Sequence, residues 1–129
     1  MPKIVPPAPS GPQPIGPYSV VTEANGLVFI SGQVAIDPAT GDKEADAAGP
    51  QTRRIMENIT HILADVALSP ADICKTTIFL TDIADFPEVN TVYAGYFADA
   101  PPARSTIQVA ALPGGYRVEI EVIASRSAN

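Results

Sequence analysis

Residues 18–36, with the sequence YSVVTEANGLVFISGQVAI, decide the fold because they predict a β-hairpin. Asn25 and Gly26 are the preferred pair for the type I′ turn that joins two antiparallel strands. The turn separates a strand over residues 18–24 from a strand over residues 27–36. The second strand is almost continuously apolar, which predicts that both of its faces are covered.

The hydrophobic pattern downstream of the hairpin predicts two helices and three more strands. Apolar residues recur at helical spacing from about residue 46 to 67, with Pro50 in the first turn, where a missing N–H costs little. The second helix begins at Asp85. Asp85 would be its N-cap, and the Glu88 side chain would reach back to Asp85 in a capping-box arrangement. The three further strands cover residues 75–80, 103–110 and 116–125. The order β-β-α-β-α-β-β predicts an α+β domain with both helices on one face of a mixed sheet.

The length of 129 residues predicts one domain over residues 1–129, with a proline-rich arm over residues 1–14. Residues 1–17 hold seven of the fourteen prolines and therefore cannot form a helix. No apolar run resembles a secretory signal or approaches the ~20 residues that cross a bilayer. We therefore expect a cytoplasmic protein with no membrane partner.

The charge and cysteine content exclude several classes of function. Eight Lys and Arg against fourteen Asp and Glu give a net charge of −6. Nucleic acid is therefore not expected as a partner, because its binding needs a basic surface. The single cysteine, Cys74, rules out an intrachain disulfide and favours a reducing compartment. We expect Cys74 to be a small buried hydrophobe and His61 to be a partly buried helix residue. No cluster with metal-ligand spacing is present, so no metal site is expected.

Arg104 stands at the head of a strand that leaves the loop Pro101-Pro102. Alternation places Arg104, Thr106 and Gln108 on one face of this strand. A guanidinium in such a place can hold a planar carboxylate with two parallel N–H···O bonds. This pattern points to a small carboxylate ligand.

The last strand alternates apolar residues with Arg117, Glu119 and Glu121. This polar side is either a solvated charged face or the source of one glutamate that faces the same cleft as Arg104 and acts as an acid or base. Spacing does not choose between Glu119 and Glu121.

Three further positions are candidates for the site. Tyr18 follows the rigid Gly16-Pro17 turn and is either core or cleft lining. Gly32 interrupts the second hairpin strand, which indicates a bulge or a close approach to the backbone. Asn90 lies one position off the apolar stripe of the second helix, which consists of Phe86, Val89, Tyr93 and Phe97, and could be an ordinary surface residue.

Seven segments of the chain, in this order and at these intervals, resemble the Rid (YjgF) family of reactive intermediate deaminases. They are residues 15–19 (IGPYS), 30–33 (ISGQ), 37–41 (DPATG), 75–80 (KTTIFL), 89–93 (VNTVY), 102–105 (PARS) and 118–121 (VEIE). The resemblance implies a chorismate-mutase-like fold. It also implies a homotrimer that buries sheet faces in a central barrel-like core, with a cleft at each subunit interface.

The resemblance also implies a reaction and a set of site residues. The reaction is hydrolysis of short 2-enamine and 2-imine acids, such as 2-aminoacrylate, 2-iminopropanoate and 2-iminobutanoate, to 2-keto acids and ammonia, without a cofactor. Arg104 would bind the substrate carboxylate, and Glu119 would position or activate water. Tyr18, Gly32 and Asn90 would line the cleft. Thr106 would also bind the substrate, through its backbone or its hydroxyl. It stands where many members have a cysteine, which puts any thiol-dependent chemistry in doubt.

Two alternative functions are compatible with the same fold. A small-acid sensor would use the same cleft without turnover, and a chaperone-like protein would depend on the trimer surface instead of Arg104 and Glu119.

Overall fold

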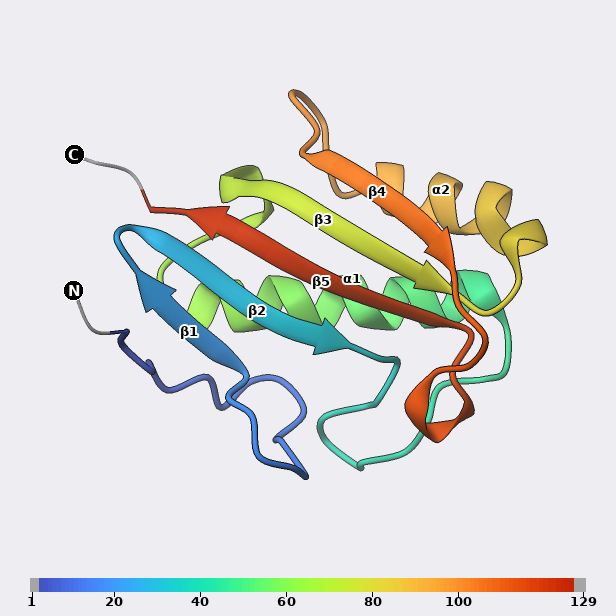
Figure 1. Cartoon of the computed structure of the whole chain (residues 1–129), viewed down its shortest axis with the longest axis horizontal. Coiled ribbons are helices and arrows are strands. Elements are labelled where there is room, and N and C mark those ends of the chain that lie inside the picture. The colour runs from blue at the N-terminus through green and yellow to red at the C-terminus, as the bar shows by residue number, and fades with distance from the viewer. Residues whose placement is uncertain (1–2, 127–129) are drawn as a thin grey trace.

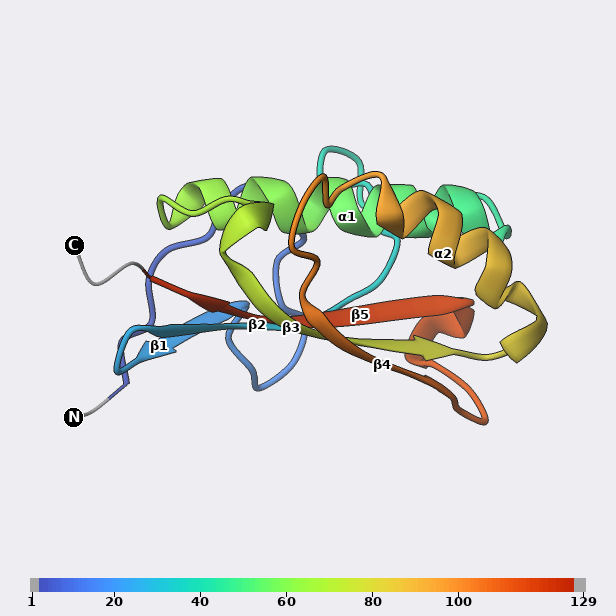
Figure 2. The same ribbon diagram turned by 90° about the horizontal axis from the view of Figure 1, so that it is seen from above.

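The computed structural model describes residues 3–126, so the ends of the predicted arm and domain (residues 1–2 and 127–129) lie outside the described residues. Five strands form one sheet in the order β1-β2-β5-β3-β4, and both helices cross the same face of that sheet (Figures 1 and 2). The elements are β1 (Val21–Ala24), β2 (Leu27–Gln33), α1 (Ala48–Asp65), β3 (Ile73–Leu80), α2 (Phe86–Ala94), β4 (Ala103–Gln108) and β5 (Val118–Ser125). The α+β class and the predicted element order are confirmed.

The β1–β2 hairpin has the predicted turn. Asn25 and Gly26 both have positive φ, 53° and 78°, as a type I′ turn requires. The prediction that both faces of the second strand are covered is wrong for a single chain. Alternate residues of β2 lie under α1, but Leu27 and Phe29 on the other face are 39% and 37% exposed.

The sheet is mixed because α2 carries the chain from β3 to a parallel β4, whereas the other neighbouring pairs are antiparallel. In the register of these strands, Thr76 of β3 lies between Arg104 of β4 and Val122 of β5. Residues opposite one another in a sheet point to the same face. This register therefore determines which site residues can meet.

The core lies between the helices and the sheet. The apolar side of β5 points to the helices as predicted, with Val118, Ile120 and Val122 buried. From α1, Ile55, Ile59 and Ile62 cover these residues with no exposed area. The helix begins at Ala48 and ends at Asp65, slightly inside the expected range.

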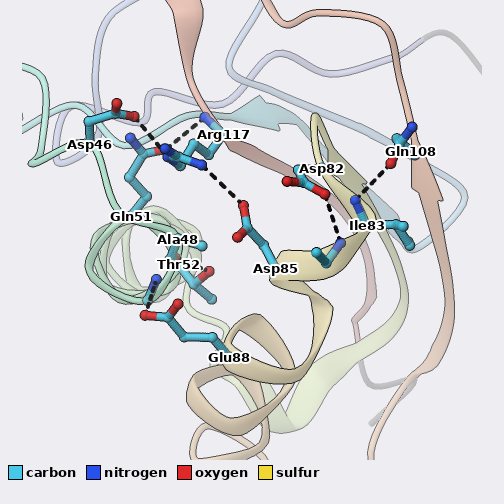
Figure 3. Close-up of polar contacts among 12 residues, drawn as sticks. Asp46, Ala48, Gln51, Thr52, Asp82, Ile83, Asp85, Glu88, Gln108 and Arg117 are labelled. Atoms are coloured by element: carbon cyan, nitrogen blue, oxygen red, sulfur yellow. Dashed lines mark hydrogen bonds and ion pairs between the residues drawn. The ribbon is translucent and has the colours of Figure 1, made fainter.

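A polar network joins the first turns of both helices to the start of β5 (Figure 3). The Arg117 guanidinium contacts Asp46 at 2.9 Å and Asp85 at 3.5 Å, and its backbone N–H donates to Gln51 Oε1 at 2.9 Å. The predicted capping box of α2 is wrong, because Asp85 makes no side-chain cap. Glu88 instead accepts a hydrogen bond from the N–H of Gly49 in α1, at 3.0 Å.

Cys74, expected to be buried, and His61, expected to be partly buried, are both exposed. Cys74 lies where the β3–β5 register shifts, and this irregularity turns its thiol outward to donate to Ile123 O at 3.3 Å. His61 lies on the outer face of α1. Among residues 3–126, no group of three potential ligands could hold a metal ion, and no helix is long and apolar enough to cross a membrane.

Candidate functional site

The predicted site residues form two groups. Tyr18, Gly32 and Glu119 lie around one cavity of about 550 Å³. Arg104 and Asn90 line a second cavity of about 410 Å³. The two cavities share no residue, so each group is described separately.

A β-bulge in β2 brings Gly32 against Glu119. Ile30 pairs with Val122 and Gln33 with Ile120, so two residues of β2 oppose the single residue Glu121 of β5. A bulge of this kind redirects side chains and is common beside active sites. A Cβ atom built on Gly32 would lie 2.8 Å from Cδ of Glu119. A side chain at this position would displace the carboxylate from where it lies, which confirms the predicted close approach.

Polar side chains fix the bulge. Ser31 Oγ donates to Ser19 O at 2.5 Å, and Gln33 Nε2 donates to Ser31 O at 3.1 Å. Gln33 is buried. Neither residue is among the sequence-based candidates, although a polar residue on each side of a strand glycine was a signal for them.

The cavity around Glu119 is mainly apolar. Besides the predicted residues, it is lined by Pro12, Val20, Ile36, Pro113 and Tyr116. Burial, and to a lesser degree the nearby charge of Glu121, raise the pKa of Glu119 above its ordinary value. Lysine and arginine are absent from this lining. The cavity can therefore present a carboxylate to a cationic group, but its lining holds no cationic side chain that could bind an anion.

Arg104 is held by α2. Its NH1 donates to Asn90 Oδ1 at 2.7 Å. Its guanidinium carbon lies 5.2 Å from the ring centroid of Phe86 and 5.1 Å from that of Tyr93, within the range of cation–π attraction. No carboxylate among residues 3–126 pairs with it. The guanidinium is thus oriented by neutral groups and keeps its charge for an anion.

Tyr93 links Arg104 to the core. Its hydroxyl shares a 2.7 Å hydrogen bond with Thr76 Oγ1, and burial raises its pKa. The apolar stripe of α2 predicts core positions for Phe86 and Tyr93 but not their contact with Arg104. The signal was available: Asn90 is four residues after Phe86 and three before Tyr93, so these three lie on one helix face.

Arg104 and Glu119 point to opposite faces of the sheet. Arg104 is level with Thr76, which is buried under α2. Glu119 lies between Val118 and Ile120, which are buried under the helices, so its side chain leaves from the open face. Within one chain the two side chains therefore do not share a cleft, and a cleft that contains both of them stays a prediction for an assembly of chains.

Thr106 is on the face of Arg104 but lines neither cavity. Its Oγ1 is buried and has no hydrogen-bonding partner among the described residues. The structure of one chain thus leaves its predicted role in substrate binding untested.

Comparisons with known proteins match the part of the chain that contains these residues. The family model described as Endoribonuclease L-PSP matches residues 8–126. Protein DfrA of Myxococcus xanthus is 48% identical over 115 residues, 88% of each chain. Reactive Intermediate Deaminase A, chloroplastic, of Arabidopsis thaliana is 45% identical over 114 residues, 88% of this chain and 61% of that protein.

A solved structure has the same fold. The crystal structure of Escherichia coli TdcF with bound serine superposes with a TM-score of 0.90 at 39% identity, covering 96% of this chain and 99% of that one. The matched region contains both groups of site residues. The chain therefore belongs to the Rid/YjgF/RutC family.

Proposed function

We propose that this protein hydrolyses small 2-enamine and 2-imine acids, among them 2-aminoacrylate, 2-iminopropanoate and 2-iminobutanoate, to 2-keto acids and ammonia. The observation that carries the proposal is the presence of two prepared groups in one chain. One is the Glu119 carboxylate in an apolar cavity, and the other is the Arg104 guanidinium, held by neutral partners. A zwitterionic imino acid needs one of each charge.

The chemistry requires only these groups and water. Arg104 binds the substrate carboxylate through two N–H donors. An enamine substrate first takes up a proton from water at its β-carbon and becomes the protonated imine. The carbon of this imine lies near Glu119, which orients a water molecule and takes its proton as the water attacks. The nitrogen of the resulting carbinolamine takes that proton back from Glu119 and leaves as ammonia, while the hydroxyl gives its own proton to water and becomes the keto oxygen. Because such substrates are already reactive in water, positioning supplies most of the acceleration. The reaction as written needs no cofactor.

The site forms between chains of a homotrimer in this proposal. Arg104 and Glu119 leave opposite faces of the sheet, so a cleft that contains both needs Arg104 from one subunit and Glu119 from another. The open face carries Leu27, Phe29 and Ile107, which are 39%, 37% and 45% exposed. Packing of three such faces into a central barrel-like core would remove this apolar surface from water.

Mixed trimers test the shared site. Arg104→Ala and Glu119→Gln chains should each be nearly inactive alone. Co-expression in equal amounts should restore about a quarter of the sites, since each mixed trimer contains one interface with both native residues. Failure of any mixture to regain activity, with trimers shown by mass spectrometry to have mixed, would refute a site built from two chains.

The activity itself is tested by coupling a serine or threonine dehydratase to the protein. Faster keto-acid release, and less semicarbazone when semicarbazide competes for the imine, are expected. Arg104→Ala should abolish both effects. Unchanged rates with the native protein would exclude the deaminase.

A small-carboxylate sensor is the second candidate, because a relative is named as binding serine and a prepared arginine suffices for binding. Calorimetry with 2-oxobutanoate, beside the activity assay, separates the two functions, since binding without turnover favours the sensor. We expect neither nucleic acid nor membrane as a partner, and a cytoplasmic location, from the charge of −6 and the sequence pattern.

A further inference from the structure

The proline-rich arm is fastened to both layers of the fold before it reaches the candidate site. Ile4 forms an antiparallel bridge with Glu23 at the outer edge of β1, with both N···O distances 2.8 Å. The chain then rises to α1 and returns to the sheet (Figure 2). On the return it supplies Pro12, Gln13 and Tyr18 to the wall of the Glu119 cavity.

The contact with α1 is made by Ser10 and Asp65. The backbone N–H of Ser10 donates to Asp65 Oδ2 at 2.8 Å, and its hydroxyl donates to Oδ1 at 2.6 Å. The next residue, Gly11, is buried against Ile62, where an added Cβ would lie 2.5 Å from Cδ1. Both carboxylate oxygens thus hold one residue of the arm, and the adjacent glycine allows the backbone to lie on the helix.

Asp65 is poorly placed for the helix that carries it. It is the last residue of α1, where the negative end of the helix dipole disfavours an anion. No basic residue in the last turn compensates for it. Its two hydrogen bonds from Ser10 therefore give this carboxylate a role in holding the arm, whereas it does not stabilise the helix.

We infer that Ser10 and Asp65 are positioning residues, which hold the arm as one wall of the Glu119 cavity and thereby set the affinity for substrate. Pro12 follows this contact by two residues, and the prolines at 12, 14 and 17 stiffen the path to Tyr18. Release of the contact would free that wall, whereas Glu119 on β5 would stay in place. The link to affinity rests on the proposed function; the fastening of the arm does not.

A repulsion-and-rescue pair tests this inference. Ser10→Asp places a second carboxylate against Asp65 and should drive the arm away. In the double variant S10D/D65N, the side-chain amide introduced at position 65 can donate to the new carboxylate and restore the contact. Ser10→Thr, which keeps the hydroxyl, is the matched control. Hydrogen exchange of a peptide covering residues 8–16 reports whether the arm is held, and steady-state kinetics report KM and kcat separately.

We expect S10D to speed hydrogen exchange and to raise KM, each by about ten-fold. This is the effect expected from the loss of one hydrogen bond to a charged group. The kcat should stay within about two-fold, because no reacting group lies on the arm. S10D/D65N and S10T should resemble the native protein in both measurements. Unchanged exchange in S10D, failure of the double variant to recover, or faster exchange with an unchanged KM would each overturn the inference. If the native protein neither turns over imines nor binds 2-oxobutanoate, the proposed function and its link to affinity fail, and exchange alone decides whether the contact holds the arm.

Discussion

Replacement of Gly32 by alanine should separate catalysis from stability. The carboxyl carbon of Glu119 would lie 2.8 Å from the new Cβ, whereas ordinary contact begins at 3.4 Å, so it must retreat by 3.4 − 2.8, about 0.6 Å. The Glu119 oxygen nearest to Gly32 must move further. The backbone at Gly32 does not have the positive φ that would itself disfavour alanine.

The cost should appear in activity. A shift of about 1 Å at a reacting group costs on the order of a hundred-fold in rate, so kcat/KM should fall by about ten- to a hundred-fold. The fold should lose only the ~1 kcal/mol of an altered Glu119 rotamer, because a side chain and not backbone must yield. The dehydratase-coupled assay and denaturant unfolding measure the two quantities.

Two further variants sharpen the result. Gly95→Ala is the matched control, since its Cβ meets only Val92 O at 3.4 Å, and it should be close to neutral in both assays. In a Glu119→Gln background, Gly32→Ala should cause little further loss, because both changes disable the same group. Native activity in Gly32→Ala, or a loss that adds fully to that of Glu119→Gln, would show that the position of the carboxylate is not what matters.

Three other perturbations follow from the same geometry. Arg104→Lys should lower kcat/KM by about ten- to a hundred-fold, since a point charge replaces neither the bidentate fork nor the stacking on Phe86 and Tyr93; near-native kinetics would contradict this. Glu121→Gln removes a negative charge that raises the pKa of Glu119, so the acid limb of the pH–rate profile should move to lower pH; a shift to higher pH would show the opposite coupling. Thr106→Val removes a buried hydroxyl without a partner and should raise the free energy of unfolding by up to about 1 kcal/mol; a fall in urea unfolding experiments would mean that the hydroxyl is paired.

Local patterns predicted the elements well because their causes are local. The Asn25-Gly26 turn needs two residues that tolerate positive φ, and the alternation of β5 needs only one buried face. The prediction of the capping box failed because the Glu88 carboxylate accepts a hydrogen bond from the N–H of Gly49, which is far away in the sequence. The prediction that Cys74 is buried failed because a register shift interrupts the alternation of side chains along β3.

The candidate site was predicted residue by residue but not as an arrangement. Alternation relates Arg104 to Thr106 and Glu119 to Glu121 within each strand. It cannot relate β4 to β5, because β3 lies between them in the sheet. The pairing of Thr76 with both Arg104 and Val122 settles that relation, and this register is a long-range property of the fold.

The separation of the two charged groups has a physical consequence. Within one chain, Arg104 and Glu119 lie on opposite faces of the sheet and cannot form an ion pair with each other. On opposite faces, Arg104 is oriented by Asn90 and two aromatic rings, while burial keeps Glu119 less acidic than usual. In the proposed trimer, the arginine of a neighbour would lower the pKa of Glu119 and favour the carboxylate. Assembly would then create the binding cleft and, in the same step, bring the pKa of the group that orients water back toward its ordinary value.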